Sequence, residues 1–356
     1  MSHFFQDLVE CMDAGRRAVI ARIIRQVGSA PRTIGTKCIF FEDGSLQGTI
    51  GGGALEFQAS TAAKDVLADD RSAILKFQLT GKEVAQTDML CGGKVDVFLE
   101  PIDPGNPSAK EVFRAAATAV AKGERGLLLT LIGEGIASKD KTCRAFVAAD
   151  GTMVGGLADV NAADEKRLRA FENISSPELM ALGEQGLQVF VETVEPDDVL
   201  FLFGAGHIST FIAPLAKMVG FKVVVVDDRE EFANRERFAS ADEILALPFA
   251  DAFRQITVTA SSYIAIVTRG HIFDHEVLRF ALEQSSGYIG MIGSKRKRDI
   301  VYKALMEEGF SEKRLKAVHS PIGLEIGAET PEEIAICIVG ELIKERALGR
   351  ADYNSS

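Results

Sequence analysis

Three consecutive glycines, Gly51–Gly53, lie between an apolar run that ends at Ile50 and a helix-prone stretch from Ala54 to Leu67. Backbone N–H groups at such a strand-to-helix turn face outward, and no side chain blocks close approach. The chemistry that this favours is binding of an anionic, phosphorylated ligand, with Glu56 in the first turn of the helix as a further candidate. A tight turn at which two backbones pack closely would use the same glycines, so the run alone leaves both interpretations open.

A second candidate is the thiol of Cys91, which Gly92 and Gly93 follow directly. Glycines on its C-terminal side would leave the thiol accessible, and nearby N–H groups would favour the thiolate. A buried packing cysteine is the alternative. Arg32 follows a proline in a loop, where its guanidinium either clamps a phosphate or is a solvated charge. The remaining cysteines lie in apolar or helical settings and are interpreted as packing residues: Cys11, Cys38, Cys143 and Cys337.

A second glycine turn lies in the other half of the chain. Val199–Phe203 has the continuous apolar character of a buried parallel strand, and Gly204 and Gly206 follow it directly. A second apolar strand ends at Asp227, 23 residues after Gly204, which is the spacing of a dinucleotide-binding fingerprint. Ser209 replaces the third glycine of that fingerprint. The context predicts a Rossmann-like fold, and nucleotide binding stays open because the fold also occurs without its ligand.

Two more loops follow predicted strands of the same sheet, Tyr263–Val267 and Tyr288–Ile292. Open α/β sheets bind ligands at the carboxyl ends of their parallel strands. Ser294 is expected to cap the next helix, whose basic first turn either meets an anion or is solvated. The histidines of these loops are candidate ligands or proton carriers, or hydrogen-bonded structural residues. The candidates in this half, besides the glycine turn and Asp227, are His207, Arg269, His271, Gly293, Ser294, Lys295 and His319.

The candidate residues of the first half lie within an internal repeat, whose fold is expected to position them. Residues 15–24 resemble 123–132, residues 38–50 resemble 145–157 with an Asp-Gly hairpin signal in each, and residues 97–100 resemble 189–192. We interpret residues of about 15–104 and 123–196 as a degenerate duplication that builds one α/β domain. The first copy is longer between Ile50 and Val97, and both Gly51–Gly53 and Cys91 lie in that interval. The first copy is therefore expected to carry the site, and the second to be scaffold.

Composition bounds the remaining possibilities. The chain has 356 residues and a formal net charge of −11, which argues against a general role on nucleic acid or at a membrane surface. No apolar run approaches the ~18 residues that span a bilayer, and no secretory signal is visible. Five scattered cysteines without a C-x-x-C pair fit neither a disulfide framework nor a zinc knuckle. We expect a cytoplasmic α/β protein with a domain at 1–196 and a Rossmann-like domain, its sheet mainly parallel, at 197–350.

These motifs together resemble the XdhC/CoxI family, accessory factors of xanthine dehydrogenase and related molybdenum hydroxylases. The resemblance covers nearly the whole chain. In the first half it is carried by Gly28–Arg32, Gly48–Glu56 and Cys91–Gly93. In the second half it is carried by Phe203–His207, Asp227–Arg229, Thr268–His271, Gly290–Lys295, Pro321–Leu324 and Thr330–Glu333.

The resemblance implies a cytoplasmic, homodimeric chaperone that binds the molybdenum cofactor, a pterin with a phosphate or dinucleotide tail. It would hold the cofactor while a cysteine desulfurase helps to install the sulfido ligand, and then pass it to the hydroxylase apoprotein. In this hypothesis Arg32 and Gly51–Gly53 hold the phosphorylated pterin, and Cys91 is a transient molybdenum ligand or sulfur relay. The turn at Gly204, Asp227 and the region of Lys295 would take the nucleotide or pyrophosphate.

Two other classes of protein are alternatives. In an NAD(P)-dependent oxidoreductase, Asp227 would hold the adenosine ribose and His271 or His319 would move protons. Against it, no serine–tyrosine–lysine set follows the nucleotide fold, and the glycine-rich specialisation lies in the other domain. A pure interaction platform, with the Rossmann-like core as a relic, is the other alternative.

Overall fold

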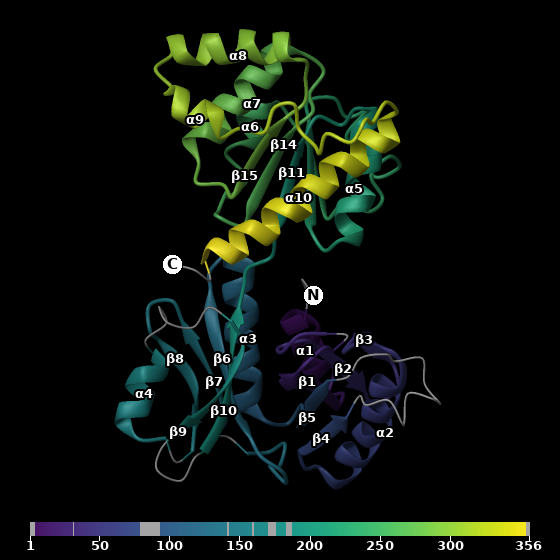
Figure 1. The fold of residues 1–356 in the computed structure, drawn as a ribbon, viewed down its shortest axis with the longest axis vertical. Coiled ribbons are helices and arrows are strands. Elements are labelled where there is room, and N and C mark those ends of the chain that lie inside the picture. The colour runs from purple at the N-terminus through teal and green to yellow at the C-terminus, as the bar shows by residue number, and fades with distance from the viewer. Residues whose placement is uncertain are drawn as a thin grey trace. The chain divides into compact units, whose positions relative to one another are not determined.

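The computed structural model describes residues 4–30, 32–78, 93–140, 142–158, 160–169, 176–182 and 187–353. Two of the candidate residues, Cys91 and Gly92, lie outside this set. The chain divides into two compact units, of which the first ends at Pro196 and the second begins at Asp197 (Figure 1). Within the described part of the chain, no helix is both long and apolar enough to cross a membrane.

The first unit begins with a helix and a five-stranded antiparallel sheet. Its elements are α1 (Phe4–Asp13), β1 (Ala18–Val27), β2 (Lys37–Phe41), β3 (Leu46–Gly48), α2 (Gly53–Asp69), β4 (Ala73–Gln78) and β5 (Lys94–Ile102). The strand order across this sheet is β3-β2-β1-β5-β4.

The same arrangement follows a second time. Its elements are α3 (Pro107–Lys122), β6 (Gly126–Ile132), β7 (Cys143–Ala148), β8 (Met153–Leu157), α4 (Ala162–Arg169), β9 (Glu178–Leu182) and β10 (Leu187–Val194). The order β8-β7-β6-β10-β9 repeats that of the first sheet, strand for strand. The predicted fold class, a domain built from a degenerate duplication, is confirmed.

Alternation along the strands assigns each face of the two sheets to a different helix. Val19, Ala21 and Ile23 of β1 pack under α2, whereas Ala18 and Ile20 pack with α1 and α3. The second sheet likewise buries its outer face under α4. Because successive side chains of a strand point to opposite faces, one apolar strand serves two cores. Helices α1 and α3 therefore lie together on the inner faces, and α2 and α4 cover the outer ones (Figure 1).

Between the inner faces lies a buried cluster of charged residues that joins the two copies. Glu100 of the first copy accepts from Arg144 of the second at 2.7 and 2.9 Å. Glu192 of the second copy pairs with Lys37 of the first at 2.5 Å. In the repeat alignment Glu100 matches Glu192 and Lys37 matches Arg144, so the two ion pairs are related by the duplication. Each copy supplies the cation for the other's carboxylate.

Arg22 occupies the centre of this cluster and is fully buried. Its Nη1 donates to Thr130 Oγ1 at 2.9 Å, and its Nε lies 3.1 Å from Glu192 Oε2. Burial alone would raise the pKa of Glu192, but the charges of Arg22 and Lys37 outweigh burial and lower it. The cluster therefore holds three cations and two carboxylates out of water.

The second unit is an open α/β sheet. Its strands are β11 (Val199–Phe203), β12 (Lys222–Asp227), β13 (Glu243–Ala246), β14 (Ser262–Ile266) and β15 (Tyr288–Met291), all parallel and in the order β13-β12-β11-β14-β15. Its helices are α5 (His207–Met218), α6 (Phe249–Ala252), α7 (His271–Glu283), α8 (Lys295–Glu307), α9 (Glu312–Lys316) and α10 (Pro331–Tyr353). The predicted parallel, Rossmann-like sheet is confirmed.

Helices cover both faces of this sheet. Core residues of α5 and α10 pack on one face, and core residues of α6, α7, α8 and α9 pack on the other (Figure 1). This arrangement brings the loops after β11, β12, β14 and β15 to one edge, the carboxyl edge of the sheet.

Candidate functional site

One edge of the first sheet collects the candidate residues of the N-terminal unit. Val27 at the end of β1 and Gln78 at the end of β4 both pair with Lys94 at the start of β5. Gly48 at the end of β3 pairs with Cys38 at the start of β2. The loop after β1, the turn before α2 and Gly93 therefore share this edge.

The Gly51–Gly53 turn owes its glycines to backbone conformation. Its φ angles are 127°, 71° and 58°, in the region that side chains other than glycine rarely adopt. A Cβ placed on Gly52 would meet no heavy atom within 4 Å, so close packing does not explain this position. The space beside Gly52, directly before the first N–H groups of α2, is therefore open.

Glu56 folds back onto the turn. Its Oε2 accepts from the Ile50 N–H at 3.2 Å and from the Thr49 hydroxyl at 2.7 Å. Thr49 Oγ1 in turn accepts from the Gly51 N–H at 3.1 Å. These contacts give Glu56 a positioning role within the turn, and direct contact with a cofactor stays a prediction. The first-turn N–H groups that follow Gly52 have no acceptor within the helix.

Gly93 and the loop after β1 pack beside this turn. A Cβ on Gly93 would lie 2.3 Å from the carbonyl oxygen of Ser29, so here close backbone packing does require glycine. Ala30 joins the hydrophobic cluster that contains Ile50 and Leu55. Arg32 lies in this loop with its side chain exposed, and no acid pairs with it among the described residues. The structure thus brings the Arg32 loop, the glycine turn and Gly93 to one edge.

The corresponding helix start in the second copy is closed by a side chain. Asn161 precedes α4, and its Oδ1 accepts from the N–H groups of Ala163 and Asp164 at 3.0 and 2.9 Å. In the first copy the residue before α2 is Gly52, which has no side chain to offer. The connection between β9 and β10 is also short, residues 183–186, against 79–93 between β4 and β5. The two copies share a fold but differ at this edge.

At the carboxyl edge of the second unit, the turn after β11 is fixed by its neighbours. Gly204 has φ 107°, and a Cβ there would lie 2.4 Å from the carbonyl oxygen of Val267. The buried Ser209 hydroxyl donates to the Gly204 carbonyl at 2.5 Å, which explains a serine in place of the third glycine. A Cβ on Gly206 would meet nothing within 4 Å. The open side of the turn is therefore at Gly206.

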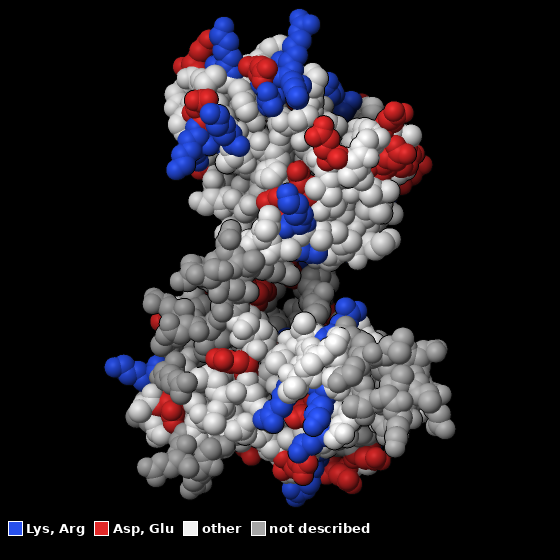
Figure 2. Space-filling view, viewed as in Figure 1, with Lys and Arg blue, Asp and Glu red and all other residues white. Residues whose placement is uncertain are grey.

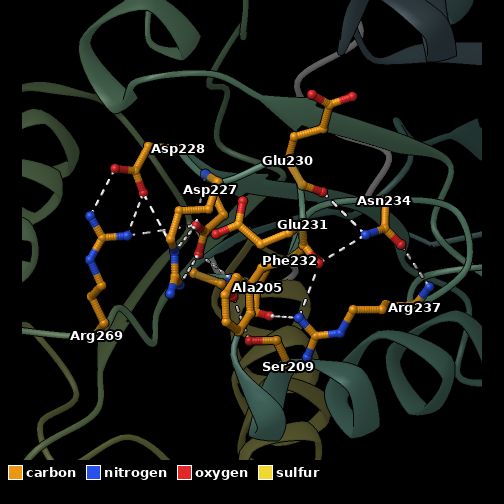
Figure 3. Close-up of polar contacts among 12 residues, drawn as sticks. Ala205, Ser209, Asp227, Asp228, Glu230, Glu231, Phe232, Asn234, Arg237 and Arg269 are labelled. Carbon is orange, nitrogen blue, oxygen red and sulfur yellow. Dashed lines mark hydrogen bonds and ion pairs between the residues drawn. The ribbon is translucent and has the colours of Figure 1, made fainter.

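Asp227 accepts several hydrogen bonds from its own domain (Figure 3). Its Oδ2 accepts from the Ala205 N–H at 2.8 Å, and Arg229 donates to both carboxylate oxygens through its side chain. Burial opposes ionisation, but these donors outweigh it and lower the pKa of Asp227. Next to it, Asp228 accepts from both terminal nitrogens of Arg269, at 2.7 and 2.8 Å.

The loops after β14 and β15 are joined by a buried acid. Asp274 is fully buried in the first turn of α7, where its Oδ1 accepts from the Thr268 hydroxyl at 2.6 Å and its Oδ2 pairs with Lys297. Ser294 caps α8 as predicted, accepting from the Lys297 N–H. Gly293 lies against the Lys297 side chain. Lys295 is exposed at the start of α8, and the side chain of Lys297 reaches back to Asp274 in the first turn of α7.

Figure 2 shows Lys and Arg side chains gathered at the end of this unit where α8 lies. The first turn of α8 contains Lys295, Arg296, Lys297 and Arg298 and no acid. His207 and His271 begin α5 and α7 and are exposed, and the ring of His207 lies edge-on to Phe211 at 5.2 Å. The structure therefore places every described candidate of this half on the carboxyl edge, except His319.

Comparison with known proteins identifies the family. Residues 200–342 match the family model described as the XdhC Rossmann domain, and residues 11–78 match the model described as the XdhC and CoxI family. The chain belongs to the XdhC and CoxI family.

Individual relatives extend this result along the chain. A probable xanthine dehydrogenase subunit of Bacillus subtilis (strain 168) is 27% identical over 357 residues, covering 97% of this chain and 98% of that protein. The uncharacterized protein YqeB of Escherichia coli (strain K12) is 29% identical over 219 residues, which span 57% of this chain and only 40% of YqeB. A crystal structure described as a xanthine dehydrogenase from Bacillus halodurans has a TM-score of 0.78 and 27% identity, over 98% of this chain and 96% of that one.

His319 of this XdhC-family chain lies in a cluster that sequence reasoning did not find. Its Nδ1 is 3.3 Å from Glu341 Oε1, and Glu341 Oε2 accepts from the Tyr288 hydroxyl at 2.5 Å and the Gly323 N–H at 2.8 Å. Hydrogen bonding to Glu341 raises the pKa of His319. Glu341 belongs to α10, so this cluster attaches the C-terminal helix to the sheet. No local pattern marks Glu341, because its partners are far away in sequence.

Proposed function

We propose that this XdhC-family protein is an accessory factor that binds the molybdenum cofactor, assists its sulfuration and delivers it to a xanthine dehydrogenase-type molybdenum hydroxylase. Family membership and the likeness to the Bacillus subtilis protein support the accessory role. The proposal includes a cysteine desulfurase as sulfur donor, the hydroxylase apoprotein as recipient and a cytoplasmic homodimer as the functional form.

The observation that carries the binding role is the difference between the helix starts of the two copies. Asn161 uses the first N–H groups of α4, whereas α2 begins at a glycine turn without a side-chain cap. Uncapped N–H groups at a helix start attract anions, because the helix dipole and the free donors act together. The phosphate of a pterin cofactor fits this donor set, and the exposed guanidinium of Arg32 lies in a loop at the same edge.

The molybdenum atom of the proposed cofactor needs a different protein group from the one that binds the phosphate. Among the described residues, no cluster of three or more His, Cys, Asp or Glu side chains could hold a metal ion. Burial raises the pKa of Cys38 to about 12 and that of Cys143 to about 11, so neither thiol is a nucleophile at neutral pH. Cys91, two residues before Gly93 in the sequence, is our candidate for the sulfur relay or transient molybdenum ligand.

The proposal is tested by mass spectrometry of ligands carried by the full chain after purification from a host that makes the cofactor. We expect a molybdenum-bound pterin with the natural sequence, and its loss in Arg32→Gln but not in Arg16→Gln, an exposed arginine of the same unit. Cys91→Ser is expected to retain the pterin and to lose activation of the hydroxylase. Protein that carries no pterin from such a host would refute the binding role, and full activation by Cys91→Ser would remove Cys91 from it.

A further inference from the structure

We propose that the Rossmann domain recognises its ligand through a phosphate group and not through a ribose diol, and that this phosphate replaces Asp228 as the partner of Arg269. The inference rests on the proposed function in one respect: it names the ligand class that the Rossmann domain of such an accessory factor would take. Two acids at the end of β12, Asp227 and Asp228, have different partners at this edge (Figure 3).

Asp227 has no acceptor capacity left for a ribose. Its Oδ1 accepts from the Arg229 backbone N–H at 3.1 Å and from Arg229 Nε at 2.8 Å. Its Oδ2 accepts from the Ala205 N–H at 2.8 Å and from Arg229 Nη2 at 3.0 Å. A carboxylate has about four lone-pair sites, so these bonds fill it. With 2% of its surface exposed, Asp227 holds the glycine turn in shape rather than facing a ligand.

Asp228 forms an ion pair with Arg269. Asp228 follows β12 and Arg269 comes shortly after the end of β14, and β11 lies between these two strands in the sheet. The pair therefore bridges the carboxyl end of β11, where the turn at Gly204–Gly206 begins (Figure 3). Phosphates of ligands bound to Rossmann domains lie on that turn. The Asp228–Arg269 ion pair therefore lies where the phosphate of such a ligand would bind.

This ion pair can be exchanged for one kind of ligand group. The side chains of Arg269 and Asp228 are 38% and 25% exposed, and exposed ion pairs contribute little to stability. A guanidinium binds phosphate in the same two-pronged geometry in which it binds carboxylate. The Arg269 guanidinium also lies over the Phe273 ring at 4.3 Å, which fixes its position. A neutral diol offers no charge to replace Asp228, whereas a phosphate does.

The test is a calorimetric titration of the full chain with ADP and with 2′,3′-dideoxy-ADP, which lacks the diol. We expect the two dissociation constants to agree within about twofold, because no buried group is left unpaired when the hydroxyls are absent. Inorganic pyrophosphate is expected to compete with both. Arg269→Gln should weaken ADP binding by about tenfold or more, since it removes a charged, bidentate contact. Asp228→Asn should strengthen binding by freeing Arg269.

A matched control is Arg254→Gln, which removes an arginine paired with Asp251 on the surface of the same domain and should leave binding unchanged. The proposal is overturned if removal of the hydroxyls weakens binding by about tenfold or more, the behaviour of a site that reads the diol. It is also overturned if Asp228→Asn does not strengthen binding, or if neither form binds ADP at millimolar concentration. Absence of a pterin from purified protein would refute the proposed function and leave these titrations unaffected.

Discussion

Carboxylates that hold loops are the common feature at the scale of single residues. Glu56 accepts from the turn before α2, Asp227 from the turn after β11, and Asp274 from Thr268 after β14. Glu56 and Asp227 can be placed at the right loops from sequence, because their positions follow from glycine turns and strand ends. Spacing alone assigns both to a ligand, which stays a prediction, and it does not reveal that each carboxylate accepts from its own backbone.

Glu56 gives a first prediction. Glu56→Ala leaves the Ile50 N–H and the Thr49 hydroxyl without their acceptor, and we expect the N-terminal unit to lose about 1–3 kcal/mol of unfolding free energy. Glu56→Gln keeps an acceptor oxygen and should recover most of that loss. Urea unfolding followed by circular dichroism measures both. Asp65→Ala, an exposed acid on the same helix, is the control, and equal stability of Glu56→Ala and Asp65→Ala would contradict the positioning role.

Gly204 and Gly206, which follow β11, give a second prediction. A methyl group on Gly204 meets the Val267 carbonyl at 2.4 Å in a conformation that disfavours side chains, so Gly204→Ala should cost about 2 kcal/mol or more. Gly206 has φ −70° and open space around it, so Gly206→Ala should change stability by less than about 0.5 kcal/mol. Thermal unfolding of the two variants measures this difference. Similar midpoints would mean that the turn is less constrained than its contacts indicate.

At the scale of elements, predictability from sequence varies with the kind of signal. The strand at Val199–Phe203 is placed correctly because a buried parallel strand is a continuous apolar run. The duplication is visible because both copies keep an Asp-Gly hairpin. The sequence predicts that Lys295 and Arg296 in the first turn of α8 reach an anion, and this stays a prediction. The contact of Lys297 with Asp274 cannot be predicted, because it depends on helical phase and on the packing of α8 beside α7. Residues in the first turn of a helix differ in their angular position around the helix axis, and composition does not say which of them faces a neighbouring element.

The attachment of α10 is an element-level property that depends on pH. The pKa of His319 is raised above its ordinary 6.5 by its hydrogen bond to Glu341, so the protonated form is favoured in the folded state. The resulting stabilisation is fully present below pH 6.5 and is lost as the pH rises through the folded-state pKa. We expect the unfolding midpoint of the C-terminal unit to fall over that interval. His319→Gln should flatten this dependence, and an unchanged pH profile in that variant would assign it to another group.

At the scale of the N-terminal unit as a whole, the buried ion cluster links the two copies of the repeat. Arg22 and Glu192 come from β1 and β10, and neither could be predicted to be buried, because a charge within a strand is normally interpreted as facing solvent. Only the packing of the two sheets against each other brings the cation of one copy to the carboxylate of the other. The partners are far apart in sequence, and no local pattern reports such a contact.

This cluster gives a prediction about charge balance. Glu192→Gln leaves Arg22 and Lys37 buried without their nearest anion, and should cost about 3–5 kcal/mol. Arg22→Met leaves two cations facing two carboxylates, so it should cost less than Glu192→Gln. Glu195→Gln, which removes the partly exposed partner of Arg125, is the control and should cost less than about 1 kcal/mol. Denaturant titration ranks the unfolding free energies of the three variants. A larger loss in Arg22→Met than in Glu192→Gln would contradict our conclusion that the cluster has one more cation than it has carboxylates.

The reciprocal pairing of Lys37 with Glu192 and of Arg144 with Glu100 has a consequence for any attempt to divide the N-terminal unit. A polypeptide that stops near residue 104 would contain Lys37 without Glu192, and Glu100 without Arg144, with only Arg22 at 3.9 Å from Glu100. The complementary piece would contain Glu192 and Arg144 without these partners. Neither fragment is expected to fold by itself. Mixed in one solution, the two should recover the native spectrum through fragment complementation, at equal molar amounts.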